Sequence, residues 1–313
     1  MPQANYLTSI FRNIRYGVFQ STLASYSLDA IKSHQKGLMQ RGLPKQKPIV
    51  GVKDIVLVSS GKGGVGKSTI ATNLAVGLKL EAPDKKIGLL DTDIFGPTIP
   101  LMMNLHDTPF LTDTNLMEPL VNYGVKWHLF FYMSFGFLIE ESSPIIWRGL
   151  MVMQALEKLM RQVNWGDIDY LVVDTPPGTG DTHLSLVQNL PINGVVLVTT
   201  PQSAALQVTK RGAVMYNMLK IPIIGLVENM SSVKCPNCSN EILIFGDGTK
   251  QLSEDLQVPI LEKLPLNRTI ADGGDKGVPV VLDANNGQSE LYRHLAKKVV
   301  QFLSSKENSK VIL

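Results

Sequence analysis

Short apolar runs alternate along the chain with segments whose apolar positions recur every three or four residues. The apolar runs are residues 55–58, 87–90, 170–173, 195–198 and 223–227. Runs of this kind suit buried strands of a parallel sheet. The periodic segments predict amphipathic helices, and they are residues 70–80, 150–163, 207–219 and 289–303. Strands bracketed by helices predict an α/β fold, in which a parallel sheet carries helices on both faces.

A glycine-rich loop separates the first predicted strand from the first predicted helix. Residues 61–68 read Gly-Lys-Gly-Gly-Val-Gly-Lys-Ser and fit the phosphate-binding pattern G-x-x-x-x-G-K-[ST]. In this pattern backbone N–H groups surround a triphosphate, Lys67 reaches the β/γ-phosphates and Ser68 binds Mg²⁺. We therefore predict nucleotide binding by Gly61, Lys62, Gly63, Gly64, Val65, Gly66, Lys67, Ser68 and Thr69.

Lys62 is a second lysine in this loop, directly after its first glycine. An ordinary phosphate loop does not need it, because Lys67 already supplies the charge. A cation at this position can contact another phosphate, or the nucleotide of a second subunit as an arginine finger does. A solvated loop lysine is the third interpretation, and the residue alone leaves all three open.

Acidic residues close two of the predicted strands. Asp174 is placed like the acid that holds Mg²⁺ in P-loop proteins, and the Pro- and Gly-rich loop 175–181 follows it. Asp91 and Asp93 follow another strand at alternate positions. One carboxylate could orient the water ligands of the metal, and the other could orient the attacking water. Acids after strands can also simply cap the next helix.

The two cysteines of the chain, Cys235 and Cys238, form a Cys-Pro-Asn-Cys motif. This spacing suits a shared metal and supplies half of a four-thiolate site, which a two-fold dimer would complete. Zinc, an iron–sulfur cluster and a redox disulfide remain open. The redox interpretation is weaker, because we predict a strand and a Ser-Ser-Val-Lys loop before the motif and no helix directly after it.

Composition sets limits on partners and size. The 313 residues, 44% of them hydrophobic, suit one large α/β domain, and no apolar run is long enough to span a bilayer. The net charge of +3 divides into +6 for residues 1–50 and −3 for the remainder. The body of the protein therefore does not indicate a nucleic-acid partner.

Residues 1–36 have the composition of a mitochondrial presequence. They are poor in acid, and Arg12 and Arg15 lie off an apolar helical face. A disordered basic tail or a membrane-surface helix is the alternative. We divide the chain into presequence 1–36, linker 37–50, ATPase domain 51–305 and tail 306–313.

Several motifs together resemble a known family. The early lysine of the glycine loop resembles the deviant Walker A loop of MinD/ParA-like P-loop ATPases. The other motifs are residues 91–97, Trp-Arg-Gly at 147–149, residues 174–181, Glu-Asn-Met at 228–230 and the cysteine motif. Together they resemble the Mrp/nucleotide-binding-protein family of iron–sulfur cluster carriers. With its presequence-like start, the chain resembles the mitochondrial, NUBPL-type branch, which serves assembly of respiratory complex I.

The resemblance implies roles for the nucleotide-site residues. It implies an ATPase that works as a homodimer and hydrolyses ATP slowly. Lys62 would contact the nucleotide of the partner subunit and Asp93 would serve hydrolysis, while Asn229 would contact adenine. Ser68, Asp91 and Asp174 would belong to the coordination shell of the Mg²⁺ ion.

The resemblance also implies a 4Fe–4S cluster bridged between two subunits by Cys235 and Cys238. Mitochondrial matrix apoproteins, such as complex I subunits, would receive it. The chain departs from the family in two respects. It lacks the four-cysteine segment of the cytosolic relatives, so only the bridging cluster is expected, and residues 125–133 are unusually aromatic.

We therefore expect an ATP-dependent iron–sulfur carrier and assembly factor. The alternative is a MinD/ParA-type partitioning or positioning ATPase without a cluster, which would have no use for Cys235 and Cys238. A dithiol oxidoreductase would leave the nucleotide site unexplained. Helix 289–303 more simply covers the sheet than binds lipid, although peripheral association with the inner membrane stays open.

Overall fold

The computed structural model describes residues 46–93, 96–107, 109–128, 156–158, 160–178 and 180–311. The predicted presequence, most of the predicted linker, the Trp-Arg-Gly motif and residues 129–133 lie outside this part of the chain, as does half of the predicted helix 150–163. Among the described residues, no helix combines the length and the apolar character needed to cross a membrane.

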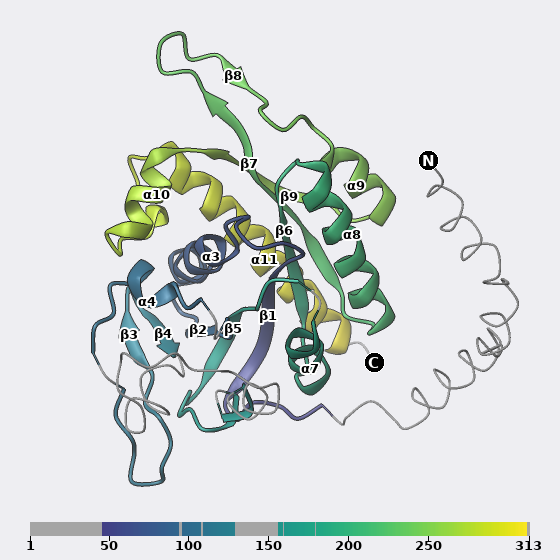
Figure 1. The fold of residues 1–313 in the computed structure, drawn as a ribbon. Helices are drawn as coiled ribbons and strands as arrows, with labels where there is room; N and C mark the ends of the chain where they lie inside the picture. The colour runs from purple at the N-terminus through teal and green to yellow at the C-terminus, as the bar shows by residue number, and fades with distance from the viewer. Residues whose placement is uncertain are drawn as a thin grey trace, which may run out of the picture. The chain divides into compact units, whose positions relative to one another are not determined.

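A nine-stranded sheet organises the described residues (Figure 1). Its strand order is β3-β4-β2-β5-β1-β6-β7-β8, with β9 also paired to β7. The pairs from β4 through β7 and the β7–β9 pair are parallel, whereas β3 and β8 join antiparallel. The strands are β1 (Val52–Ser60), β2 (Ile87–Asp91), β3 (Leu120–Asn122), β4 (Val125–His128), β5 (Ile168–Asp174), β6 (Gly194–Thr199), β7 (Ile223–Lys234), β8 (Glu241–Ile242) and β9 (Ile260–Leu266).

Helices cover both faces of this sheet, as the sequence predicts (Figure 1). Side chains of α3 and α11 pack with one face, and those of α7, α8 and α9 pack with the other. The helices are α3 (Lys67–Glu81), α4 (Ile99–Met102), α7 (Asp181–Asn189), α8 (Ser203–Met218), α9 (Thr249–Leu256), α10 (Arg268–Asp275) and α11 (Gly287–Val311), with a 3₁₀ turn at Val280–Leu282.

Strand β1 shows why the apolar runs are uninterrupted. Val56 and Val58 belong to the core beneath α3 and α11, while Ile55 and Leu57 belong to the core beneath α7 and α8. Because successive side chains of a strand point to opposite faces, a strand covered on both sides is apolar at every position.

Two boundaries differ from the prediction. Strand β7 continues through the Ser-Ser-Val-Lys segment to Lys234, because Val233 pairs with β9 and Lys234 with β8. The cysteines therefore follow a strand directly, and no loop separates them from it. Helix α11 runs to Val311, so its last turns enter the segment predicted as the tail 306–313.

Candidate functional site

The glycine-rich loop lies between β1 and α3, at the carboxyl end of the parallel strands (Figure 1). Gly64 and Gly66 have φ angles of 78° and 86°, a left-handed conformation that glycine adopts without strain. Gly66 is also the residue before the first turn of α3, whose N–H groups form an anion-binding end. The loop opens into a pocket lined by Ser60, Gly63, Gly64, Gly66, Lys67, Ser68, Thr69, Asp93, Thr98, Met102 and Pro177.

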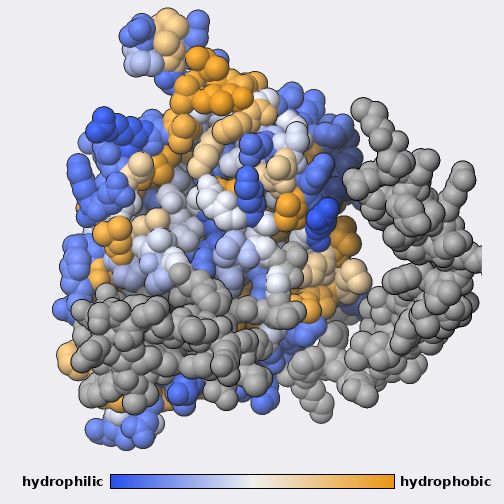
Figure 2. Space-filling view, in the orientation of Figure 1, coloured by the Kyte–Doolittle hydropathy of each residue, from blue (hydrophilic) through white to orange (hydrophobic). Residues whose placement is uncertain are grey.

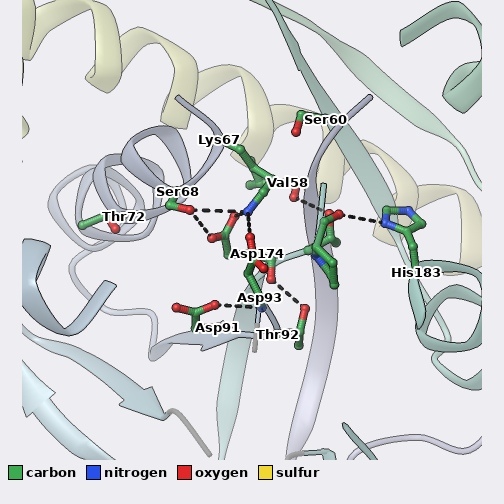
Figure 3. A network of polar contacts seen from close by, with 12 residues as sticks. Val58, Ser60, Lys67, Ser68, Thr72, Asp91, Thr92, Asp93, Asp174 and His183 are labelled. Carbon is green, nitrogen blue, oxygen red and sulfur yellow. Dashed lines mark hydrogen bonds and ion pairs between the residues drawn. The ribbon is translucent and has the colours of Figure 1, made fainter. Parts of the chain in front are cut away.

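Lys67 and Ser68 converge on one carboxylate (Figure 3). Lys67 Nζ lies 2.6 Å from Asp174 Oδ1 and 3.8 Å from Asp93 Oδ2. Ser68 Oγ donates to Asp174 Oδ2 over 2.6 Å. The two groups that the motif assigns to phosphate and Mg²⁺ are thus held by the acid at the end of β5.

Asp91 and Asp93 complete an acidic cluster around Lys67 (Figure 3). The Asp93 N–H donates to Asp91 Oδ1 over 2.9 Å, while Asp91 Oδ2 is buried without a hydrogen-bond partner among the described residues. Burial raises the pKa of Asp91 well above its ordinary value, and the charge of Asp174 adds to the effect. Burial also raises the pKa of Asp93, against the opposing charge of Lys67.

This cluster fits a hard divalent cation. Mg²⁺ binds oxygen ligands from one or two carboxylates and keeps several waters, and an unpartnered buried carboxylate oxygen is such a ligand. Ser68, Asp91 and Asp174 are the residues that would hold the ion. The oxygen donors that the sequence assigned to it are therefore brought together.

Asn229 supports the glycine-rich loop from the neighbouring strand. Its Nδ2 donates to the Val65 carbonyl over 2.8 Å, and the residue is buried near the middle of β7. Lys62 instead is exposed, and its Nζ lies 3.4 Å from Gln202 Oε1 at the start of α8. Neither residue is among those that line the phosphate pocket of the loop.

A buried histidine–tyrosine pair was not predicted from the sequence. Tyr216 of α8 donates its hydroxyl to His183 Nε2 over 2.6 Å. On the other side of the ring, His183 Nδ1 lies 3.3 Å from the Pro176 carbonyl, and Figure 3 shows His183 beside the acidic cluster. Burial lowers the pKa of His183 to about 4, so the ring is neutral, with its proton on Nδ1. The pair anchors the loop after Asp174. Its one sequence signal was a histidine two residues beyond that loop.

The cysteines lie apart from the nucleotide pocket, in the turn between β7 and β8 (Figure 1). Cys238 is exposed and Cys235 is partly exposed. Cys235 accepts a hydrogen bond from Ser239 N and donates one to Asn240 O, both of 2.9 Å, through its backbone. Hydrogen bonds from the backbone of Cys238 and Asn237 lower the pKa of the Cys235 thiol, which favours the metal-binding thiolate.

Comparison with known proteins identifies relatives of the whole fold. Residues 51–300 match the family model described as ParA, NUBPL iron-transfer P-loop NTPase. The mouse iron–sulfur cluster transfer protein NUBPL is 50% identical, over 88% of this chain and 86% of the relative. An Arabidopsis thaliana mitochondrial iron–sulfur protein required for NADH dehydrogenase is 47% identical, over 81% of this chain and 80% of the relative.

Solved structures of other proteins share this fold. The nucleotide-binding protein from Archaeoglobus fulgidus, in complex with ADP, superposes with a TM-score of 0.62 and is 31% identical, covering 72% of this chain and 87% of that protein. The cell-division ATPase MinD from Pyrococcus furiosus shares the fold at 19% identity, with a TM-score of 0.55 over 79% of this chain and 98% of its own. The chain belongs to the ParA-type family of NUBPL iron-transfer P-loop NTPases.

Proposed function

We propose that this protein is an ATP-dependent carrier that delivers a 4Fe–4S cluster to mitochondrial apoproteins, with complex I subunits among the recipients. The observation that carries the proposal is the exposed Cys235–Cys238 turn in a chain of an iron-transfer family. The names of the mouse and Arabidopsis relatives support the cargo and the recipient. The site of action in this proposal is the mitochondrial matrix, which the presequence-like residues 1–36 support.

The cluster is cargo held by four thiolates from two subunits of a homodimer. A cubane cluster takes four cysteine ligands, and each chain offers two. In the described part of the chain, no His, Asp or Glu side chain joins the two cysteines to make a metal-binding group of three. Exposure of the Cys235–Cys238 turn suits a donor, because an accessible cluster can pass to another protein's thiolates.

ATP binding and slow hydrolysis form the second half of the proposal. Lys67 and the loop N–H groups bind the phosphates, and Ser68, Asp91 and Asp174 hold Mg²⁺, which supplies charge neutralisation at the phosphates. Asp93 lines the pocket and is placed to orient the attacking water. Lys62, whose Nζ contacts Gln202, acts on the partner's nucleotide, while Asn229 contacts adenine from β7.

Anaerobic reconstitution with iron and sulfide tests the cargo. The wild-type protein should gain the absorption and EPR spectra of a 4Fe–4S cluster, at about one cluster per dimer under the four-thiolate rule. Cys235→Ser and Cys238→Ser should each lose the cluster and keep ATP binding, because the nucleotide site lies elsewhere on the sheet. A cluster of unchanged yield on the double variant would contradict the proposal.

The partitioning ATPase remains the second candidate function. MinD shares this fold, but at 19% identity the likeness concerns the fold alone. A partitioning ATPase gives no role to an exposed thiol pair whose first member has a lowered pKa. Normal ATP-dependent activity of the double cysteine variant in cells would favour this candidate.

A further inference from the structure

The loop at residues 175–178, which follows the buried acid at the end of β5, is fixed to the end of β1 at two points. Thr175 donates its hydroxyl to the Val58 carbonyl over 3.1 Å. Gly178 donates its N–H to the Ser60 carbonyl over 2.9 Å. The two residues between these points are prolines, which have no N–H to donate. Hydrogen bonds can therefore hold the backbone between the two points only through its carbonyl groups.

A histidine of α7 binds one of these carbonyl groups. His183 Nδ1 lies 3.3 Å from the Pro176 oxygen, and the Tyr216 hydroxyl lies 2.6 Å from His183 Nε2. Since a carbonyl oxygen only accepts hydrogen bonds, Nδ1 carries the ring proton, and Nε2 accepts from Tyr216. Ser59, at the end of β1, forms a hydrogen bond with Tyr216 in turn. Ser59, Tyr216 and His183 are each at most 3% exposed, so water does not compete for these hydrogen bonds.

The peptide unit between Pro176 and Pro177 connects this contact to the nucleotide pocket. Its six atoms lie in one plane, and none of the described peptide bonds is cis. In a trans unit the Cδ atom of Pro177 lies on the side of the C–N bond opposite to the Pro176 oxygen. Pro177 lines the nucleotide pocket. His183 thus holds one edge of a rigid unit whose other edge belongs to a residue of the pocket wall.

We propose that His183 is a positioning residue, which holds the loop at residues 175–178 in the place that ATP hydrolysis requires. It acts through the Pro176 carbonyl, because His183 is not among the residues that line the pocket. This inference rests on the proposed function and adds a residue that controls the rate of its ATPase half.

The phosphates have a separate binding element, the glycine-rich loop. Residues 62–64 of that loop are exposed, whereas His183 is buried. Figure 2 shows mostly pale or hydrophilic surface over the end of β1 and the start of α3, near the middle of the view. Because the His183 contact lies outside this phosphate-binding element, its loss should slow hydrolysis and leave ATP affinity nearly unchanged.

The test compares two substitutions in the full chain. His183→Asn keeps an N–H donor, because the amide nitrogen of asparagine takes about the place of imidazole Nδ1, whereas His183→Leu fills the site without a donor. Phosphate release at saturating ATP should fall about tenfold in His183→Leu and stay within about twofold of the wild type in His183→Asn. The ATP Kd should stay within about twofold in both, which also verifies that they are folded. His106→Leu is the matched control, because His106 is exposed.

Three kinetic outcomes overturn the inference. Wild-type hydrolysis by His183→Leu would mean that the contact with the Pro176 carbonyl does not set the rate. Equal slowing in the Leu and Asn variants would assign the effect to packing of the ring and not to its hydrogen bond. A rise in the ATP Kd that accounts for the slower hydrolysis would assign His183 to nucleotide binding.

Nitrogen-15 NMR of the wild type with labelled histidine provides a second measurement, which needs no hydrolysis. The His183 signal, identified by its absence from both variants, should show the proton on Nδ1 and should shift when a non-hydrolysable Mg²⁺–ATP analogue replaces Mg²⁺–ADP. A proton on Nε2, or a signal that is the same with both nucleotides, overturns the inference. A wild type that binds ATP without hydrolysing it contradicts the ATPase half of the proposed function, and the NMR signal then decides alone whether His183 positions the loop for a triphosphate.

Discussion

At the scale of single residues, the site depends on the Lys67–Asp174 ion pair. Both side chains are buried, and their 2.6 Å contact compensates charges that would be costly to bury alone. Lys67→Ala should abolish ATP binding and lower the free energy of unfolding by about 3 kcal/mol, because Asp174 loses its cation. Calorimetric titration with ATP and urea unfolding measure the two effects. Lys62→Ala, in the same loop but exposed, should retain ATP binding. Unchanged ATP affinity of a folded Lys67→Ala variant would contradict the P-loop assignment.

His183 leads to a second prediction at the residue scale, which concerns how the free energy of unfolding depends on pH. Its pKa of about 4 lies below the ordinary 6.5, because burial disfavours the charged ring. The unfolded chain therefore binds a proton at His183 more readily than the folded chain does. The contribution of neutral His183 to the free energy of unfolding is complete above pH 6.5 and is lost as the pH falls toward 4. Between about pH 7.5 and about pH 5 the wild type should lose about 2 kcal/mol through this group.

Urea unfolding of His183→Gln at the two pH values isolates that contribution. The variant keeps Asp91, Asp93 and Asp174, whose raised pKa values act in the opposite direction in both proteins. The variant should therefore lose less stability on acidification than the wild type. His106→Gln changes an exposed histidine and should behave as the wild type. Equal losses in all three proteins would rule out a buried neutral His183.

The residue scale also shows how far a sequence pattern reaches. Lys67, Ser68 and Asp174 could be grouped from the sequence, because the loop motif and the strand-end rule place them at one edge of the sheet. The hydrogen bonds among these side chains could not be predicted from the sequence, because side-chain contacts depend on the packed fold. His183 was missed for the same reason: its partner Tyr216 is 33 positions away, and no spacing connects them.

At the scale of elements, the buried strands were predictable and the edge strands were not. Strands β1, β2, β5 and β6 lie inside the sheet and are apolar on both faces. Strand β9 pairs with β7 alone, and its sequence mixes Glu262, Lys263 and Pro265 with apolar residues. An edge strand tolerates charge and proline, so its pattern is indistinct. The length of β7 was underestimated because its last residues are polar and gain their partners only from β8 and β9.

The junction of the glycine-rich loop with β7 gives an element-scale prediction. A Cβ atom on Gly66 would lie 2.2 Å from Asn229 Nδ2, and the φ of Gly66 is +86°. Gly66→Ala should therefore lower the free energy of unfolding by at least about 1 kcal/mol, through backbone strain and the clash, and abolish ATP binding. Gly63→Ala is the control, because a Cβ there meets nothing within 4 Å. Thermal unfolding and ATP titration compare the two, and equal effects would contradict the close contact.

At the scale of the whole molecule, one strand joins the two candidate sites. Asn229 touches the glycine-rich loop and Cys235 begins the cysteine turn, six positions later along the direction of β7. That separation is at most about 20 Å, the length of a fully extended strand, because β7 has an irregularity between Asn229 and Val233. The sequence placed both motifs in one domain, but only the topology brings them to the same strand. Assembly is the level that a single chain specifies least, since it depends on surfaces that contact a second molecule.

Lys62 provides the whole-molecule prediction, because its proposed role needs two chains. Its Nζ lies 3.4 Å from Gln202 Oε1, and Lys62 is not among the residues that line the pocket of its own loop. Alone, Lys62→Ala should bind ATP without hydrolysing it, and Lys67→Ala should not bind it. In a mixed dimer, the Lys62→Ala chain keeps an intact pocket and receives Lys62 from the Lys67→Ala chain, so one site should regain hydrolysis. Phosphate release from the mixture, set against each variant alone, measures this recovery. If Lys62 serves its own pocket, neither site of the mixed dimer is complete, and the mixture would stay inactive.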